Sequence, residues 1–500
     1  MTVVNPNSIS GITSITMPSG GDNVLTIHTN NGVERFRIDS SGNVKVGSAA
    51  TISPDGDVFF TGVCTATTLS GAASGLTGAL PAISAASLTN VPAANVVGVH
   101  TSLTVTNATT TGTAVVGGGV TISESGIEAS GIGITCANIN GGQIGGRRNK
   151  VINGAMTVSQ RNGTTAVQLS ATEQYIVDRF TNDSASSFDM KADASQSTDS
   201  PDGFSNSLKL ACDGVSTPSS IQNGAISSYI EGQDLQDLAF GTSNAKPLTL
   251  SFYAKSASQN NGHVYGVFLG AYLNGTRNAQ TRGFTITSSW QRFIMTFDGT
   301  GTVTSTAINN NNNKGMQICF SLAAGSDDQK NYATWTADSG LRGFTGQDNF
   351  FDNTSNEIYI TGVQLEVGSQ ATAFEHRSFG EELDLCRRYY YNPAFQCAYA
   401  TQILFNGSGY DGSTIYHACV LPTPMRTVPT IEQNTGGSYF QSYGNGGSNS
   451  YSTLNIDNTG STSIVEIYNG GSHSRGGGVS HFTRLNSATT DGKFRLTAEL

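Results

Sequence analysis

The chain has 500 residues and carries little charge. It contains 60 glycines, 12% charged residues, and 26 Lys and Arg against 36 Asp and Glu, for a formal net charge of −10. Its 37% of hydrophobic residues is too high for a disordered chain, and the length allows about three to four domains. No apolar run reaches the roughly 18 residues of a membrane span, the opening MTVVNPNSIS has no signal-peptide pattern, and no long Lys/Arg cluster suits a phosphate backbone. We expect neither membrane insertion nor nucleic-acid binding.

The cysteines and histidines indicate no metal or cofactor chemistry. Seven scattered cysteines contain no CxxC pair, and the sequence has no HExxH motif and no phosphate-binding Gly-rich loop. Such a set is typical of buried free thiols in a protein made in a reducing cytosol. We therefore expect no cofactor, no metal site and no disulfide framework.

Asn-Gly and Asp-Gly pairs recur along the whole chain. Among them are Asn153-Gly154, Asn223-Gly224, Asn274-Gly275, Asn406-Gly407 and Asn445-Gly446. These pairs favour the type I′ turns of β-hairpins, because both central residues need φ > 0. The pattern predicts a mostly antiparallel β chain, with a hairpin turn at each pair.

The first 148 residues predict strands that need other chains to bury them. Residues 1–47 read as an N-terminal β attachment region whose strands are too short to hold a core alone. Residues 48–148 change to Gly, Ser, Thr and Ala, with apolar positions at period two such as Val120 and Ile122. A flexible linker has no need of that alternation. We predict an intertwined trimeric β shaft over 48–148, with a loose linker as the alternative.

Longer strands with aromatic residues return over 149–380. The predicted strands cover 175–180, 207–210, 248–253, 264–269, 290–297, 316–322 and 357–366, which indicates a jelly-roll-like β-sandwich. Ser378 and Glu381 then fit a capping box, so a helix is predicted to begin there, with 381–391 as a connecting helix. Residues 392–500 return to short strands and turns and predict a distal β-sandwich tip. The expected fold class is all-β.

Two parts of the sequence resemble a β-sandwich module of bacteriophage tail fibres and receptor-binding proteins. The first is VINGAMTVSQR at 151–161 with YIVDRF at 175–180. The second and stronger one contains ITGVQLEVG at 360–368, ATAFEHR at 371–377 and GEELDLCRRYY at 380–390. The stretch VERFRIDSSGNV at 33–44 is similar to a repeat of marine phage structural proteins.

This resemblance implies a virion tail fibre that binds a host cell-surface receptor, expected to be a glycan, during phage adsorption. It implies a homotrimer whose N-terminal region attaches to other phage tail or baseplate proteins and whose tip binds sugar. The chain would be synthesised in the host cytoplasm and act in the virion.

Aromatic residues are the candidates for glycan contact. Trp335 follows a polar loop and is either a stacking platform or a core residue. Tyr439, Tyr443 and Tyr451 alternate with Ser, Gly and Asn over 436–451, a composition used by recognition loops, because Tyr gives rigid contact and small polar residues give adaptable hydrogen bonds. The alternative for that stretch is an ordinary Gly-rich surface loop.

No catalytic residue is predicted. Paired acids that could cleave a glycoside exist at Asp327-Asp328, around Glu231 and at Glu381-Glu382, but each has a plainer role in a turn, a loop or a helix start. The expected function is therefore binding without catalysis. A tailspike-type polysaccharide depolymerase and a cellular adhesin remain the alternatives.

Overall fold

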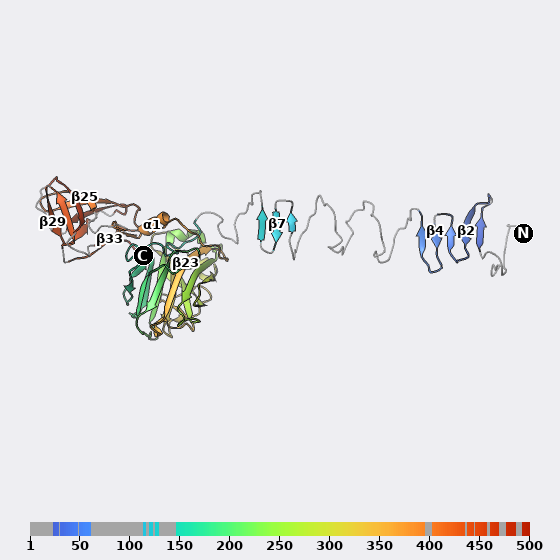
Figure 1. Cartoon of the computed structure of the whole chain (residues 1–500), viewed down its shortest axis with the longest axis horizontal. Helices are drawn as coiled ribbons and strands as arrows, with labels where there is room; N and C mark the ends of the chain where they lie inside the picture. Colours follow the sequence, from blue (N-terminus) through green and yellow to red (C-terminus); the bar gives the residue numbers. More distant parts are fainter. Residues whose placement is uncertain are drawn as a thin grey trace. The chain divides into compact units, whose positions relative to one another are not determined.

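The computed structural model describes residues 24–29, 31–48, 50–61, 147–395, 403–435, 438–444, 446–457, 461–469, 477–486 and 493–500, and three strands between 114 and 129. These parts are almost entirely β-structure (Figure 1), which confirms the predicted fold class. The chain divides into two compact units, Met1–Thr111 and Gly112–Leu500. Most of the predicted shaft, 48–148, lies outside the described residues, so the shaft and its trimeric winding remain predictions.

The first unit contains one antiparallel five-stranded sheet in sequential order. Its strands are β1 (Leu25–His28), β2 (Glu34–Ile38), β3 (Val44–Val46), β4 (Ala50–Ile52) and β5 (Val58–Phe60). Three of its turns share one hydrogen-bond pattern, in which a glycine N–H donates to the carbonyl three residues earlier. Those glycines, Gly32, Gly42 and Gly56, have φ values of 82°, 85° and 94°, a region that favours residues without a Cβ.

In the second unit a small antiparallel sheet precedes the first sandwich. It is formed by β6 (Ala114–Val116), β7 (Val120–Ser123) and β8 (Gly126–Ala129).

Two antiparallel sheets form the first sandwich. One has seven strands in the order β10 (Tyr175–Val177), β11 (Phe180–Ala185), β14 (Asn223–Glu231), β19 (Lys314–Ala324), β16 (Val264–Leu273), β17 (Thr276–Thr285) and β21 (Thr336–Ala337). The other has six, in the order β18 (Gln291–Phe297), β15 (Leu248–Ser256), β23 (Glu357–Val367), β13 (Ser207–Cys212), β12 (Ala192–Ser197) and β9 (Val167–Gln168). Shorter elements are β20 (Gln329–Lys330), which pairs parallel with β22 (Gly343–Phe344), and the 3₁₀ turns η4 (Gly232–Leu238), η5 (Gly301–Thr304) and η6 (Phe350–Asp352).

The main hydrophobic core lies between these two sheets. Phe252 of β15 meets Phe320 of β19 edge to face, with ring centroids 4.9 Å apart. Both rings are buried, and the alternation along each strand sends every second side chain into the same core. Of the predicted strands, 207–210, 248–253, 264–269, 290–297, 316–322 and 357–366 are confirmed to within a few residues.

The strand predicted over 175–180 is wrong as a single strand. β10 ends at Val177 and β11 begins at Phe180, and the two pair antiparallel. The reversal occurs at Asp178-Arg179, where Arg179 has a φ of 71°. This turn contains no glycine, and both of its side chains, Asp178 and Arg179, are buried. Their burial therefore stabilises the reversal of the chain.

Two Asn-Gly pairs that predict turns lie inside strands instead. Asn223-Gly224 belongs to β14, and Asn406-Gly407 belongs to β25 (Ile403–Gly409). A Cβ on Gly224 would lie 2.8 Å from the ring of Phe188, and one on Gly407 would lie 2.1 Å from the carbonyl oxygen of Tyr416. Both glycines are therefore needed for close packing rather than for a turn. The prediction is correct at Asn274-Gly275, where positive φ values of 46° and 81° join β16 to β17.

The predicted helix is α1 (Phe379–Arg387), shorter at its C-terminal end than expected. Its capping box is confirmed, because the Ser378 side chain accepts from the Glu381 N–H and the Glu381 side chain accepts from the Ser378 N–H. The strand β24 (Tyr390–Tyr391) follows almost at once and pairs with β33 (Phe494–Thr497), near the other end of the distal region.

The distal region is a second β-sandwich of unequal layers. A three-stranded sheet, β24-β33-β27 (Thr430–Gln433), faces a seven-stranded sheet. The larger sheet has the order β29 (Gly447–Tyr451), β28 (Phe440–Gly444), β32 (Ser480–Leu485), β25, β26 (Ile415–Val420), β31 (Ile464–Asn469) and β30 (Leu454–Ile456). Phe405 and Phe494 join the layers, with ring centroids 5.0 Å apart.

Four cysteines fall in the described residues, at positions 212, 319, 386 and 419, and all four are free and buried, as predicted. Burial raises the pKa of the Cys319 thiol to about 12. Cys64, Cys136 and Cys397 lie outside the described residues. None of the described helices is long and apolar enough to cross a bilayer.

Candidate functional site

Trp335 lies in the core of the first sandwich. Its side chain is only 4% exposed, it packs edge to face against Phe240, and its indole N–H donates to the carbonyl of Asp298. The ring has no free face for a sugar. Of the two roles considered for Trp335, the structure gives it the role of a core residue.

The three tyrosines of the predicted recognition loop have different surroundings. The segment is a β-hairpin, β28 and β29, rather than an irregular loop. Tyr451 is 4% exposed and its hydroxyl lies 2.7 Å from the Thr483 hydroxyl, so it belongs to the distal core. Tyr439 is half-buried and packs against that core. Tyr443 alone of the three is on the side of the sheet that faces away from the core.

We call this side of the seven-stranded sheet the outer distal face. Alternation along the strands defines it: on β26, Ile415, His417 and Cys419 are buried, whereas Tyr416 and Val420 point the other way. The register places Tyr416 beside Tyr468 of β31 and Tyr443 beside Phe482 of β32. Aromatic side chains therefore stand on this face at two places.

The first aromatic group is Tyr443 with Phe482. Their rings stack with centroids 5.1 Å apart and planes 9° from parallel. The Arg484 guanidinium lies 4.5 Å from the centroid of the Tyr443 ring and also donates to its hydroxyl. The Tyr443 hydroxyl donates to Gln441 at 2.5 Å. These contacts hold the Tyr443 ring in one orientation, which lowers the entropy cost of binding to it.

The second aromatic group contains Tyr410, Tyr416 and Tyr468. Tyr416 lies 5.8 Å from each of the other two rings, centroid to centroid. Its hydroxyl donates to Asp457 at 3.1 Å, and this hydrogen bond raises the pKa of the Tyr416 hydroxyl. Tyr410 is 76% exposed, more than any other large hydrophobic side chain of the described residues. Its ring is available for contact with a ligand.

Each aromatic group borders a hollow. The smaller hollow, of about 400 Å³, is lined by Tyr443, Gly444, Gly446, Gly447, Ser448, Ser480 and Phe482. The larger, of about 850 Å³, is lined by Asn406, Gly407, Ser408, Gly409, Tyr410, Tyr416, His417, Ala418, Asp457, Glu466 and Gly478. Ser408 and Ser480 are paired across β25 and β32, so the two hollows lie on adjoining strands. Their lining of rings, glycines, hydroxyls and amides suits a hydroxyl-rich ligand.

Charge distinguishes the two hollows. The larger one contains the carboxylates of Asp457 and Glu466 and no Lys or Arg among its lining residues. Beside the smaller one stands Arg484, which is engaged with Tyr443 and Gln441. An anionic ligand would be repelled from the larger hollow.

Sequence reasoning found Tyr443 and missed Tyr410, Tyr416, Tyr468 and Phe482. The alternation of STIYHACV at 413–420 could have placed Tyr416 opposite the buried Ile415 and His417. The pairing of β26 with β31 and of β28 with β32 joins residues far apart in the sequence, and no local pattern contains it.

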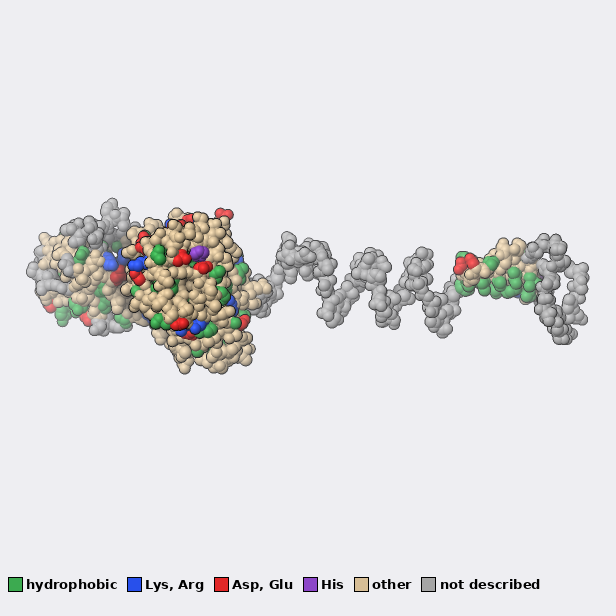
Figure 2. Space-filling view, turned by 90° about the horizontal axis from the view of Figure 1, so that it is seen from below, with side chains coloured by type: hydrophobic (Ala, Val, Ile, Leu, Met, Phe, Trp, Pro, Cys, Tyr) green, Lys and Arg blue, Asp and Glu red, His purple; other side chains and the backbone are tan. Residues whose placement is uncertain are grey.

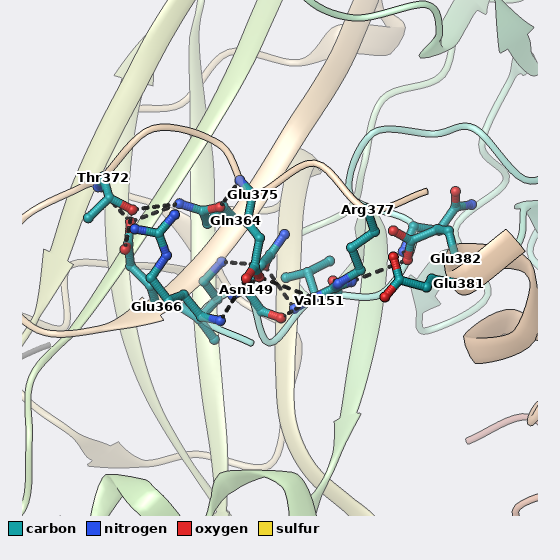
Figure 3. A network of polar contacts seen from close by, with 12 residues as sticks. Asn149, Val151, Gln364, Glu366, Thr372, Glu375, Arg377, Glu381 and Glu382 are labelled. Carbon is teal, nitrogen blue, oxygen red and sulfur yellow. Dashed lines mark hydrogen bonds and ion pairs between the residues drawn. The ribbon is translucent and has the colours of Figure 1, made fainter. Parts of the chain in front are cut away.

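The residues that carry the tail-fibre resemblance form a buried polar network in the first sandwich (Figure 3). The Glu366 carboxylate accepts from the Thr372 N–H at 2.8 Å, and Gln364 accepts from the Glu375 N–H at 2.8 Å. Glu375 in turn accepts from the Asn149 N–H at 2.8 Å. The network ties the segment after β23 to the start of the sandwich.

Arg377 extends the same network toward α1. It donates to the Val151 carbonyl at 3.0 Å and to Glu382 at 3.3 Å, and Glu382 accepts from the Asn153 N–H at 2.5 Å. The polar groups of these side chains form hydrogen bonds within the protein (Figure 3). The motif therefore closes the sandwich and does not itself form an exposed site.

The acid pairs considered for catalysis have structural partners. Glu231 is fully buried and accepts from Arg388 at 2.6 Å and from the Tyr389 hydroxyl at 2.6 Å. Asp328 pairs with Arg342 and accepts from Asn223. Among the residues that the structure describes, no group of three or more His, Cys, Asp or Glu side chains could hold a metal ion.

Neither a protein-family model nor a curated protein matches this chain. Several solved structures are similar to it at low identity. One is the enzymatically active domain of tailspike protein 4 of bacteriophage CBA120, at 13% identity and a TM-score of 0.23; the match covers 44% of this chain and 21% of that chain. Another is the CBM22-1 xylan-binding domain of Xyn10C from Paenibacillus barcinonensis, at 9% identity and a TM-score of 0.21, covering 42% of this chain and 99% of that one.

A third similar structure is the family 11 carbohydrate-binding module of the Clostridium thermocellum cellulase Lic26A-Cel5E. It has 14% identity and a TM-score of 0.21, and the match covers 43% of this chain and 99% of that module. What these proteins bind or cleave is a property of those proteins.

Proposed function

We propose that this chain is a receptor-binding tail fibre of a bacteriophage virion and that the outer distal face binds a host-surface glycan. The observation that carries the proposal is the pairing of ordered or exposed aromatic rings with polar hollows on adjoining strands. A sugar ring places its C–H face on an aromatic ring and its hydroxyls against polar groups. Tyr443 and Tyr410 supply the rings, and Ser408, Ser480 and Asp457 supply polar groups.

The tail-fibre part of the proposal rests on the sequence resemblance at 151–180 and 360–390. The resemblance implies a homotrimer whose N-terminal region attaches to other tail or baseplate proteins. Three copies of a weak site would then act together through avidity, which raises the overall affinity for a repetitive cell surface without any new contact.

Binding by the outer distal face can be tested with the full-length protein. Lipopolysaccharide and capsular polysaccharide preparations from a panel of bacteria would be screened in a surface-binding assay, and those bound would be retested with Tyr410→Ala and Tyr443→Ala. We expect each variant to weaken binding at least about fivefold, because an aromatic contact contributes on the order of 1 kcal/mol at each copy.

Tyr272→Ala is the matched control, since Tyr272 is a half-buried tyrosine on β16 of the first sandwich. It should bind as the wild type does. If Tyr272→Ala loses binding while Tyr410→Ala and Tyr443→Ala retain it, the glycan site belongs to the first sandwich and the assignment to the outer distal face is wrong.

A depolymerase is the second candidate function, because Asp457 and Glu466 line one hollow. Glycoside hydrolysis uses two carboxyl groups that flank the scissile bond. Release of new reducing ends from a bound polysaccharide, abolished by Glu466→Gln, would establish catalysis. If the polysaccharide stays bound and no reducing ends are released during a long incubation, the chain is a binding protein and the depolymerase candidate is wrong.

A further inference from the structure

One face of the β1–β5 sheet is made entirely of apolar side chains. The register aligns two rows across all five strands. One row is Leu25, Ile38, Val44, Ile52 and Val58, and the other is Ile27, Phe36, Val46, Ala50 and Phe60. We call these ten residues the apolar face.

The opposite face of the same sheet is polar apart from Phe59. It carries Thr26, Arg37, Lys45 and Thr51, which pair in the register between the apolar rows. Lys45 forms an ion pair with Asp39 at 3.1 Å, and Arg37 forms one with Glu34 at 3.4 Å. The sheet thus has one face suited to water and one that is not.

The apolar face is not covered by the described residues. Ile27, Val46, Val58 and Phe60 are each about half exposed, at 54%, 50%, 48% and 51%. None of the ten residues belongs to a buried hydrophobic cluster. In Figure 2 hydrophobic side chains of this sheet gather along one side of it, and acidic side chains lie on another.

A sheet of this kind cannot remain folded as one exposed layer. Its strands have three to five residues, and a sheet needs a second layer to bury its apolar side. At strand spacings of about 4.8 Å and about 3.4 Å per residue, the face is a stripe of roughly 24 by 10 Å. The cover must therefore be present whenever the sheet is folded.

We propose that copies of this chain pack their β1–β5 apolar faces against one another. A permanent cover must be supplied together with the chain, and each copy brings an apolar surface of the same length and width. The sizes of the side chains are also complementary. The row that contains Phe36 and Phe60 has the small Ala50 next to Phe60. A phenylalanine ring of one copy can therefore fill the space above Ala50 of another copy. The inference specifies the assembly surface of the proposed fibre and does not depend on the glycan site.

Two adjacent residues provide a matched pair for the test. Ile52 points to the apolar face and Thr51, its neighbour on β4, points to the polar face. Full-length wild type, Ile52→Lys and Thr51→Lys would be compared by light scattering and by hydrogen exchange of residues 24–61. For the wild type we expect a mass at least twice the 52.1 kDa of one chain and slow hydrogen exchange in β1–β5.

Ile52→Lys should lose the slow exchange throughout β1–β5 while residues 147–395 keep theirs, and Thr51→Lys should behave as the wild type does. Three results would overturn the proposal: a monomeric wild type with slow exchange in β1–β5, slow exchange retained in Ile52→Lys, or equal loss in both variants.

A photo-cross-link identifies what covers the face. A benzophenone-bearing residue would replace Ile52 in one full-length protein and Thr51 in another. We expect illumination of the first to give a product of twice the chain mass, with the link mapped to residues 24–61 of a second copy, and the second to give much less. Links from position 52 only to the same chain would refute the assignment. Neither readout uses a glycan, so failure here is distinct from failure of the proposed binding site.

Discussion

The carboxylate of Glu499 forms an ion pair with Arg179, whose guanidinium is 1% exposed within the first sandwich. Arg161 pairs with the same carboxylate at 3.1 Å. The two guanidinium groups lie 3.5 Å from the ring centroids of Tyr389 and Tyr390 respectively, so the β24 segment is held between cations and core. Burial opposes the charge of Arg179, but Glu499 together with Tyr389, Tyr175 and Cys386 favours it and leaves the pKa of Arg179 above the ordinary value. This cluster joins the two sandwiches.

Glu499→Gln should therefore loosen the distal sandwich from the first one. Removing one partner of a buried pair leaves the other charge uncompensated and costs on the order of 3–5 kcal/mol. We expect a lower melting temperature and faster proteolysis between residues 388 and 430. Glu466→Gln is the control, because Glu466 is an exposed carboxylate on the outer distal face. It should leave the melting temperature and the rate of proteolysis unchanged.

Tyr451→Ala and Tyr443→Ala should have opposite effects on stability and binding. Tyr451 is packed in the distal core, and truncating a buried aromatic ring costs about 3–5 kcal/mol, so its variant should unfold at a lower temperature. Tyr443 lies on the outer distal face, and its variant should keep a near wild-type melting temperature while binding glycan less well. Scanning calorimetry distinguishes them; equal destabilisation would contradict the outward orientation of Tyr443.

The distal sandwich should lose stability in mild acid because of His417. Its side chain is 1% exposed, and burial lowers its pKa from 6.5 to about 4. A depressed histidine pKa means that the neutral form stabilises the fold: the stabilisation is complete above pH 6.5 and is lost as the pH falls from 6.5 to 4. The shift corresponds to about 3 kcal/mol.

Hydrogen exchange of β25 and β32, measured from pH 7 to pH 4 and corrected for intrinsic rates, reports this loss. His417→Gln should remove most of the pH dependence in that window. An identical slope in the variant would assign the acid sensitivity to other groups.

Gly154→Ala and Gly380→Ala should change stability in opposite directions. A Cβ on Gly154 would lie 2.1 Å from the Val363 carbonyl oxygen, so that variant must displace β23 and should be severely destabilised. Gly380 lies in α1, and its Cβ would meet nothing within 4 Å. Alanine there should stabilise the protein by about 0.5–1 kcal/mol, because it reduces the freedom of the unfolded chain. Chemical denaturation of both variants checks the signs.

The sequence by itself determined the features that depend on neighbouring residues. Runs of apolar and aromatic residues predicted most strands of the first sandwich, and the spacing of Ser378 and Glu381 predicted the start of α1, because both depend on residues close together in the chain. The number and scatter of the cysteines predicted buried free thiols. Only the tertiary structure decided the features that depend on distant segments. Pairing of β26 with β31 brought Tyr416 to Tyr468, burial assigned Trp335 and Tyr451 to cores, and close packing placed Asn223-Gly224 and Asn406-Gly407 inside strands. Local sequence cannot specify these outcomes, because the free energy that fixes them comes from contacts between residues tens to hundreds of positions apart.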